Sequence, residues 1–140
     1  VYDLAARGTS ILVTTHYMDE AENCHRVAFI YRGKIVAEGS PNEMKTRQML
    51  AQVVEIDCDK SDVALTTLRD AKLFDEVALY GALIHAIGEN AREKISRARE
   101  ILHAHNVAVN DMQIIVPSLE DVFIARLRNV DINGRKTDDR

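Results

Sequence analysis

The segment Thr9-Ser-Ile-Leu-Val-Thr-Thr-His-Tyr-Met-Asp-Glu-Ala-Glu22 decides how the chain folds around its first candidate site. Its apolar run at residues 11–13 is short and rich in branched side chains, which predicts a strand buried on both faces of a sheet. Acidic residues cluster at the end of the segment, as is typical of the first turns of a helix. His16 is therefore expected where a buried strand leads into a helix, the position at which open α/β sheets commonly bind ligands.

A lone histidine at such a position has two interpretations. It can be a structural residue whose ring is hydrogen-bonded, or it can act in a site, because the charge of histidine is adjustable near neutral pH. The residue types alone leave both interpretations open. We interpret the acidic residues that follow, Asp19, Glu20 and Glu22, as helix N-terminal charge rather than as a metal site.

The bulk composition excludes several classes of protein. The chain has 140 residues with 18 basic and 22 acidic side chains, so its formal net charge is −4. This length fits one ordinary domain or two small ones. No basic run suits a nucleic-acid surface, no apolar stretch approaches the roughly 20 residues of a membrane-spanning helix, and the N-terminus does not resemble a signal peptide. We therefore expect a core-forming chain without a nucleic-acid partner.

The remaining metal-binding residue types are scattered. Cys24 and Cys58 have no CxxC partner, which predicts two reduced thiols rather than a disulfide or a zinc site. His85, His103 and His105 lack metal-ligand spacing with a carboxylate or a cysteine, and we expect the last two to be solvated. The sequence therefore predicts no metal site.

The rest of the first unit consists of short elements. Residues 26–31 and 34–38 are apolar runs on either side of a turn that contains Gly33, which predicts a β-hairpin. Ser40-Pro41 then suits the N-cap and first position of a helix. That helix is expected to end near residue 50 and to complete the unit.

A second unit is expected over residues 51–130. The pattern predicts strand, helix, strand, strand, helix, strand and a final helix, the order of a ferredoxin-like βαββαβ fold with one added helix. Ser118-Leu-Glu-Asp121, at the start of the last helix, resembles a capping box with Asp in place of Glu. Residues 131–140 lack apolar anchors, which predicts a disordered tail. The predicted fold class is therefore α/β, of the α+β type.

Three stretches resemble the end of an ABC transporter ATP-binding subunit. They are Thr14-Thr-His-Tyr-Met-Asp-Glu-Ala-Glu22, Cys24-His-Arg-Val-Ala-Phe-Ile-Tyr-Arg-Gly-Lys-Ile-Val-Ala-Glu-Gly-Ser-Pro41 and Ser118-Leu-Glu-Asp-Val-Phe123. The chain is most similar to subunits that export drugs and other small molecules. The resemblance implies that residues 1–50 are the C-terminal fragment of a nucleotide-binding domain and that residues 51–130 are a small accessory domain.

The resemblance also implies a role for His16. The matching histidine of the family is the switch histidine, which meets the γ-phosphate of ATP and the attacking water, so His16 is the candidate catalytic residue of the intact subunit. That subunit would bind ATP and Mg²⁺. Its implied partners are a second nucleotide-binding subunit and a transmembrane permease, and its implied location is cytoplasmic, at the inner face of the cell membrane.

Other parts of an ABC ATPase site do not occur in this sequence. It contains no GxxxxGK[ST] loop, no Asp-Glu pair at the end of a strand before the histidine and no Ser-Gly-Gly signature. We therefore expect that the chain alone holds no cofactor and does not hydrolyse ATP.

Two alternatives stay open for the second unit, which could sense a small molecule or serve as a dimerisation module. The predicted strand at residues 11–13 would lack the neighbours that a complete domain provides. Such an exposed edge predicts either a homodimer or a disordered first third of the chain.

Overall fold

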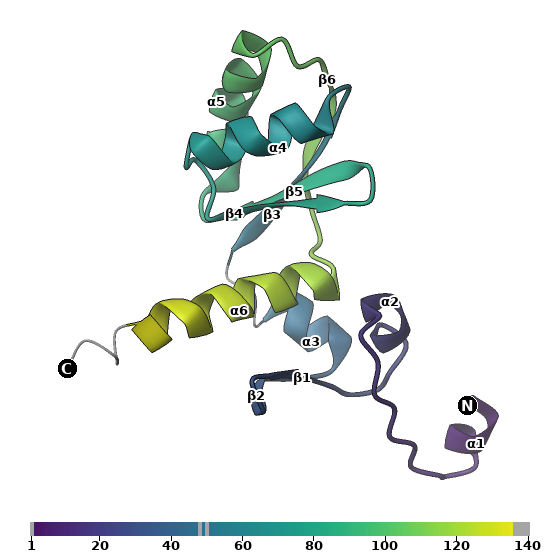
Figure 1. Cartoon of the computed structure of the whole chain (residues 1–140). Helices are drawn as coiled ribbons and strands as arrows, with labels where there is room; N and C mark the ends of the chain where they lie inside the picture. The colour runs from purple at the N-terminus through teal and green to yellow at the C-terminus, as the bar shows by residue number, and fades with distance from the viewer. Residues whose placement is uncertain (1, 48, 50, 136–140) are drawn as a thin grey trace.

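The computed structural model describes residues 2–47, 49 and 51–135. In these ranges helices accompany two antiparallel sheets, which confirms a mixed α/β chain and is compatible with the α+β type (Figure 1). The helices are α1 (Tyr2–Ala6), α2 (Met18–Ala21), α3 (Pro41–Thr46), α4 (Ser61–Asp70), α5 (Ala91–Ala104) and α6 (Leu119–Arg135). The strands are β1 (Val27–Tyr31), β2 (Lys34–Gly39), β3 (Gln52–Cys58), β4 (Glu76–Tyr80), β5 (Leu83–Gly88) and β6 (Val109–Ile115).

The larger sheet has four strands in the order β4-β5-β3-β6, and all neighbouring pairs are antiparallel. Helices α4 and α5 cover one of its faces (Figure 1). The core between them is built from aliphatic side chains such as Val54, Ile56 and Ile84 of the sheet and Leu68 and Leu102 of the helices. Because side chains alternate along a strand, the residues between these positions face the other side of the sheet.

Helix α6 covers that other face and lies between the sheet and a layer made of α3 and the β1–β2 hairpin (Figure 1). Leu119 and Val122 of α6 share a second core with Val53 and Ile87 of the sheet and with Met44 of α3. The last helix of the described chain is therefore a middle layer. It contacts elements on both sides of the predicted division at residue 50.

The β1–β2 hairpin rests on α6 through one face. The ring of Phe29 meets the ring of Phe123 edge to face, with centroids 5.1 Å apart. The opposite face of the hairpin exposes Ile30 and Ile35, which pair with each other across the two strands. One apolar face of the hairpin is thus packed, and the other meets solvent.

Reciprocal capping motifs begin α3 and α6, two helices of the second core. At α3, Ser40 Oγ accepts a hydrogen bond from the Glu43 N–H at 3.3 Å, and the Glu43 carboxylate accepts one from the Ser40 N–H at 3.0 Å. At α6, Ser118 Oγ accepts from the Asp121 N–H at 3.2 Å, and Asp121 Oδ2 accepts from the Ser118 N–H at 2.8 Å. The second motif confirms the predicted capping box. A cap of this kind stabilises a helix by roughly 1 kcal/mol.

The strand predicted at residues 11–13 is wrong for this structure. The segment has no regular secondary structure, and the side chains of Ile11, Leu12 and Val13 are 40 %, 97 % and 53 % exposed. A strand needs a neighbour to pair its backbone N–H and C=O groups, and the two sheets of the described chain do not include this segment. Its apolar residues therefore meet solvent rather than a core.

Two element ends differ from the predicted ones. Helix α3 ends at Thr46, short of residue 50, and residues 48 and 50 lie outside the described ranges. Helix α6 runs to Arg135, so residues 131–135 are helical where a disordered tail is expected. Residues 136–140 of that predicted tail lie outside the described ranges.

Candidate functional site

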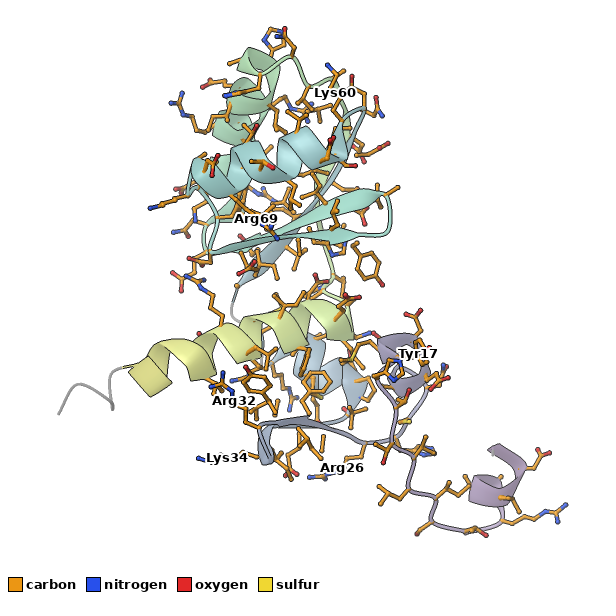
Figure 2. All side chains as sticks on the ribbon, viewed as in Figure 1. Tyr17, Arg26, Arg32, Lys34, Lys60 and Arg69 are labelled. Atoms are coloured by element: carbon orange, nitrogen blue, oxygen red, sulfur yellow. The ribbon has the colours of Figure 1, made fainter. Side chains whose placement is uncertain are left out.

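His16 lies in an exposed segment that leads into α2. Its ring lies against the ring of Tyr17, with centroids 4.1 Å apart and planes tilted by 36°. Figure 2 shows Tyr17 beside α2, at the end of the long N-terminal connection. The structure therefore places His16 at the entry to a helix, as predicted, but without the strand that was expected to precede it.

Thr15 fixes the path of the chain around His16. Its hydroxyl donates a hydrogen bond to Glu20 Oε2 at 2.5 Å and accepts one from the Tyr17 N–H at 3.0 Å. Tyr17 is the N-cap residue of α2 and makes no side-chain cap of its own. Thr15 therefore forms a local turn around His16 and joins the loop that carries His16 to the side chain of Glu20 in α2.

Glu22 connects the end of α2 to two other helices. Its Oε2 accepts a hydrogen bond from Lys45 Nζ of α3 at 2.6 Å, and its Oε1 accepts one from the backbone N–H of Leu119 at 3.3 Å. Leu119 is the first residue of α6, whose N–H has no partner within the helix. The carboxylate thus satisfies a free helix donor and anchors the segment after His16 to α6.

A cluster of ionisable groups lies on the α6 side of the four-stranded sheet. His85 of β5 is 2 % exposed, with its Nδ1 2.8 Å from Asp121 Oδ1 and its Nε2 3.3 Å from Glu55 Oε2. The ring of Tyr80 stacks on the imidazole with centroids 4.5 Å apart and planes 8° apart. Each ring nitrogen of a buried histidine therefore faces a carboxylate.

The carboxylates change the acid–base behaviour of the cluster. Burial by itself lowers the pKa of His85, but the hydrogen bonds and negative charges of Asp121 and Glu55 outweigh burial and raise the pKa above its ordinary value. Burial acts in the opposite sense on Asp121, where hydrogen bonds from His85 and Ser118 outweigh it and lower the pKa. Both shifts favour an imidazolium–carboxylate pair. The cluster is therefore an ion pair between a strand and a helix.

The sequence patterns did not predict this cluster. They show no metal-ligand spacing around His85, and they indicate only a helix cap for Asp121. The register of the sheet pairs Glu55 with His85, and α6 supplies Asp121 from above that pair. One sequence signal could have indicated that this side of the sheet is buried. Val53 and Val54 are adjacent apolar residues of β3, and because neighbours on a strand face opposite sides, they indicate that both faces of the sheet are covered.

The comparisons with known proteins agree on one family. No protein-family model matches the chain. The probable multidrug ABC transporter ATP-binding protein YbhF of Escherichia coli is 43 % identical over 47 residues, which are 34 % of this chain and 8 % of that protein. The Nod factor export ATP-binding protein I of Ralstonia nicotianae is 30 % identical over 122 residues, which are 86 % of this chain and 37 % of that protein. The homologues of the chain are ABC transporter ATP-binding proteins.

A third relative extends the same pattern. The Nod factor export ATP-binding protein I of Paraburkholderia xenovorans is 46 % identical over 54 residues, which are 38 % of this chain and 18 % of that protein. The chain therefore spans at most 37 % of the length of these three relatives. Within the described ranges, no helix has both the length and the apolar character required to cross a membrane.

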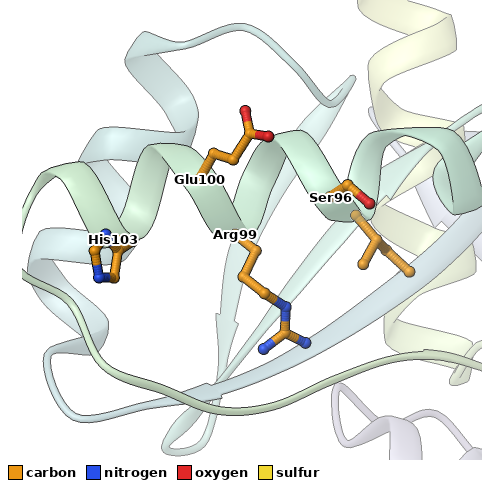
Figure 3. Close-up of a pocket in the computed structure, with 5 residues that line it drawn as sticks. Ser96, Arg99, Glu100 and His103 are labelled. Carbon is orange, nitrogen blue, oxygen red and sulfur yellow. The ribbon is translucent and has the colours of Figure 1, made fainter.

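Few side chains in the described part of the chain lie where they could bind a ligand together. Among its residues, no three His, Cys, Asp or Glu side chains are placed to hold a metal ion. A surface hollow of about 490 Å³ runs along α5 and is lined by Ile95, Ser96, Arg99, Glu100 and His103 (Figure 3). All of these side chains come from one helix, and Figure 3 shows Arg99 and Glu100 pointing in different directions. Because ligand sites have convergent polar groups, we assign no ligand to this hollow.

Proposed function

We propose that this chain serves in the ATP-hydrolysing subunit of an ABC exporter of small molecules, with His16 as the residue that donates a hydrogen bond to the γ-phosphate of ATP. The observation that carries the proposal is the similarity of 86 % of the chain to a relative named as an export ATP-binding protein. The placement of His16 supports it, because an exposed imidazole at the entry to α2, held by Thr15, is accessible to a ligand. Positioning and electrostatic stabilisation supply most of the catalysis of phosphoryl transfer.

The apolar residues that meet solvent fit the same proposal. Leu12 and Val13 lead up to His16, and Ile30 and Ile35 form the open face of the hairpin. Exposed apolar groups of this kind mark contact surfaces. In the proposed subunit these groups pack against the part of the nucleotide-binding domain that carries the phosphate-binding loop. ATP and Mg²⁺ would be held there.

The second unit has its own place in this proposal. We assign residues 51–130 to a ferredoxin-like accessory domain, supported by the strand order β4-β5-β3-β6 and by the position of α4 and α5 on one face of the sheet. The first unit, residues 1–50, completes the nucleotide-binding domain. The proposed partners are a second nucleotide-binding subunit, in a homodimer, and a transmembrane permease at the cytoplasmic face of the membrane.

A chimaera tests the role of His16. The segment of the Ralstonia export protein that aligns with this chain is replaced by this chain, and ATP hydrolysis is measured together with ATP binding. We expect His16→Ala to reduce the turnover number by about 10²–10³-fold, as for removal of one transition-state donor, while ATP binding is retained. His25→Ala is the matched control, since His25 is also an exposed histidine of the first unit. Equal turnover of the His16 variant and the unsubstituted chimaera would refute the assignment.

The chain on its own is expected to be inactive. Without a GxxxxGK[ST] loop the 140 residues have no backbone cradle for the phosphates. Isothermal titration of the purified chain with MgATP should therefore detect no micromolar affinity, and no phosphate release should exceed the buffer rate. Tight binding would contradict this part of the proposal.

A further inference from the structure

The geometry around His85 requires one particular protonation state. Both ring nitrogens face carboxylate oxygens, at 2.8 Å for Asp121 and 3.3 Å for Glu55. A neutral imidazole has one N–H donor, whereas the imidazolium has two, so only the protonated ring donates to both partners. The observed arrangement is therefore that of a charged His85.

The groups that face His85 come from every element packed around it in the described chain. Asp121 approaches from α6, Glu55 from β3 and the ring of Tyr80 from β4. Burial raises the pKa of the Tyr80 hydroxyl, and the carboxylates of Asp19 and Glu120 raise it further, so Tyr80 remains neutral while His85 titrates. The proton on His85 is thus the variable charge of the cluster near neutral pH.

The first turn of α6 connects this cluster to the first unit. Asp121 joins His85 through Oδ1 and caps the helix through Oδ2. Two residues earlier, the Leu119 N–H donates to Glu22 at the end of α2. The same turn of helix is thus held by the sheet on one side and by the segment after His16 on the other.

We propose that His85 is a proton-dependent lock that holds α6 to the four-stranded sheet and thereby controls how firmly the first unit is held. When the ring is protonated, it pairs with both carboxylates. When it loses the proton, it can donate to only one of them, and buried Asp121 is left without a countercharge. The N-terminal turn of α6 then loosens, together with α3 and the hairpin that rest on it. The lock acts through packing and does not depend on ATP hydrolysis.

The pH range of the effect follows from the direction of the shift. Because the folded state raises the pKa of His85 above its ordinary value of 6.5, its contribution is fully present below that value and is lost as the pH rises through the folded-state pKa. A pKa raised by one pH unit corresponds to about a tenfold change in the equilibrium constant. Asp121 titrates at the acid end instead, because its pKa is lowered.

Site-resolved hydrogen exchange of the 140-residue chain tests the lock. Protection factors, corrected for the intrinsic exchange rate, are measured between about pH 5.5 and 8.5. We expect protection in α6, α3 and the β1–β2 hairpin to fall about tenfold for each pH unit by which the pKa is raised, while protection in α4 and α5 stays constant. Equal loss in all elements, or no loss in α6, would overturn the proposal.

Two variants and one direct measurement complete the test. His85→Gln cannot be charged, so its α6 protection should not vary with pH, whereas His103→Gln, at an exposed histidine of α5, should behave as the wild type. Unchanged pH dependence in His85→Gln would refute the lock. If that variant does not fold, NMR titration of the His85 ring in the wild-type chain decides alone. A pKa above 6.5 supports the lock, and a pKa at or below 6.5 refutes it.

Discussion

His85 Nδ1 and Asp121 Oδ1 lie 2.8 Å apart although 36 positions separate the two residues in the chain. The contact joins β5 to the first turn of α6 in a place where both side chains are almost fully buried. A buried ion pair contributes little net stability compared with an apolar pair, but it is strongly destabilising to break. The clearest predictions concern its removal.

Asp121→Ala should lower the free energy of unfolding by about 3–5 kcal/mol, because it removes the more deeply buried partner of His85 and leaves the Nδ1–H of the imidazolium without an acceptor. It also removes the cap on the Ser118 N–H. Urea denaturation measures the change, with a constant m-value as the sign of two-state unfolding. Glu120→Ala, in the same turn but less buried, is the control and should cost less than about 1 kcal/mol. Similar losses for the two variants would contradict the assigned role of Asp121.

The acid side of the stability curve should also depend on Asp121. Its folded-state pKa is lowered, so its stabilisation is present above the ordinary aspartate value of 3.8 and is lost as the pH falls through the folded-state pKa. Asp121→Asn cannot titrate, so its stability deficit relative to the wild type should shrink below about pH 4. Urea midpoints measured over this range test the expectation. A deficit that stays constant down to about pH 2 would exclude this linkage.

Glu22→Ala should lower the free energy of unfolding by about 1–3 kcal/mol, because the Leu119 N–H and the Lys45 ammonium both lose their acceptor. Glu22→Gln keeps an acceptor oxygen for the helix N–H and should cost less. Thermal or urea unfolding distinguishes the two variants. If Glu22→Gln lowers the free energy of unfolding as much as Glu22→Ala does, the charge of Glu22 rather than its hydrogen bond joins α2 to α6.

Leu12→Lys should change the stability of this chain by less than about 0.5 kcal/mol, since the side chain is 97 % exposed. The added charge should also reduce any self-association, which sedimentation at several concentrations can measure. Met44→Ala is the opposite case, because Met44 is 0 % exposed, and it should cost about 2–5 kcal/mol. A loss for Leu12→Lys as large as that of Met44→Ala would show that residue 12 is buried in solution.

Local sequence patterns predicted most of the elements. The turn at Gly33 predicted the β1–β2 hairpin. Ser40 and Ser118 predicted the starts of α3 and α6 through their capping chemistry. These signals succeed because caps and tight turns are decided within a few residues.

The wrong or missing predictions concern contacts between residues that lie far apart in the sequence. The apolar run at residues 11–13 has strand composition, but composition supplies no neighbour for the backbone, and the segment is irregular. The cluster of Glu55, His85 and Asp121 depends on sheet register and on the docking of α6, which no local pattern encodes. His16 precedes a helix as predicted but does not follow a buried strand, and its contact with a nucleotide stays a prediction.

The middle layer of the molecule is made after the two layers that it joins. Residues 119–135 leave the ribosome later than the hairpin and the sheet, so Phe29 lacks its contact with Phe123 while the preceding residues are being synthesised. The packed face of the hairpin is therefore buried only after α6 has been made. Until then that apolar face stays open in the nascent chain, and it is where a chaperone would bind.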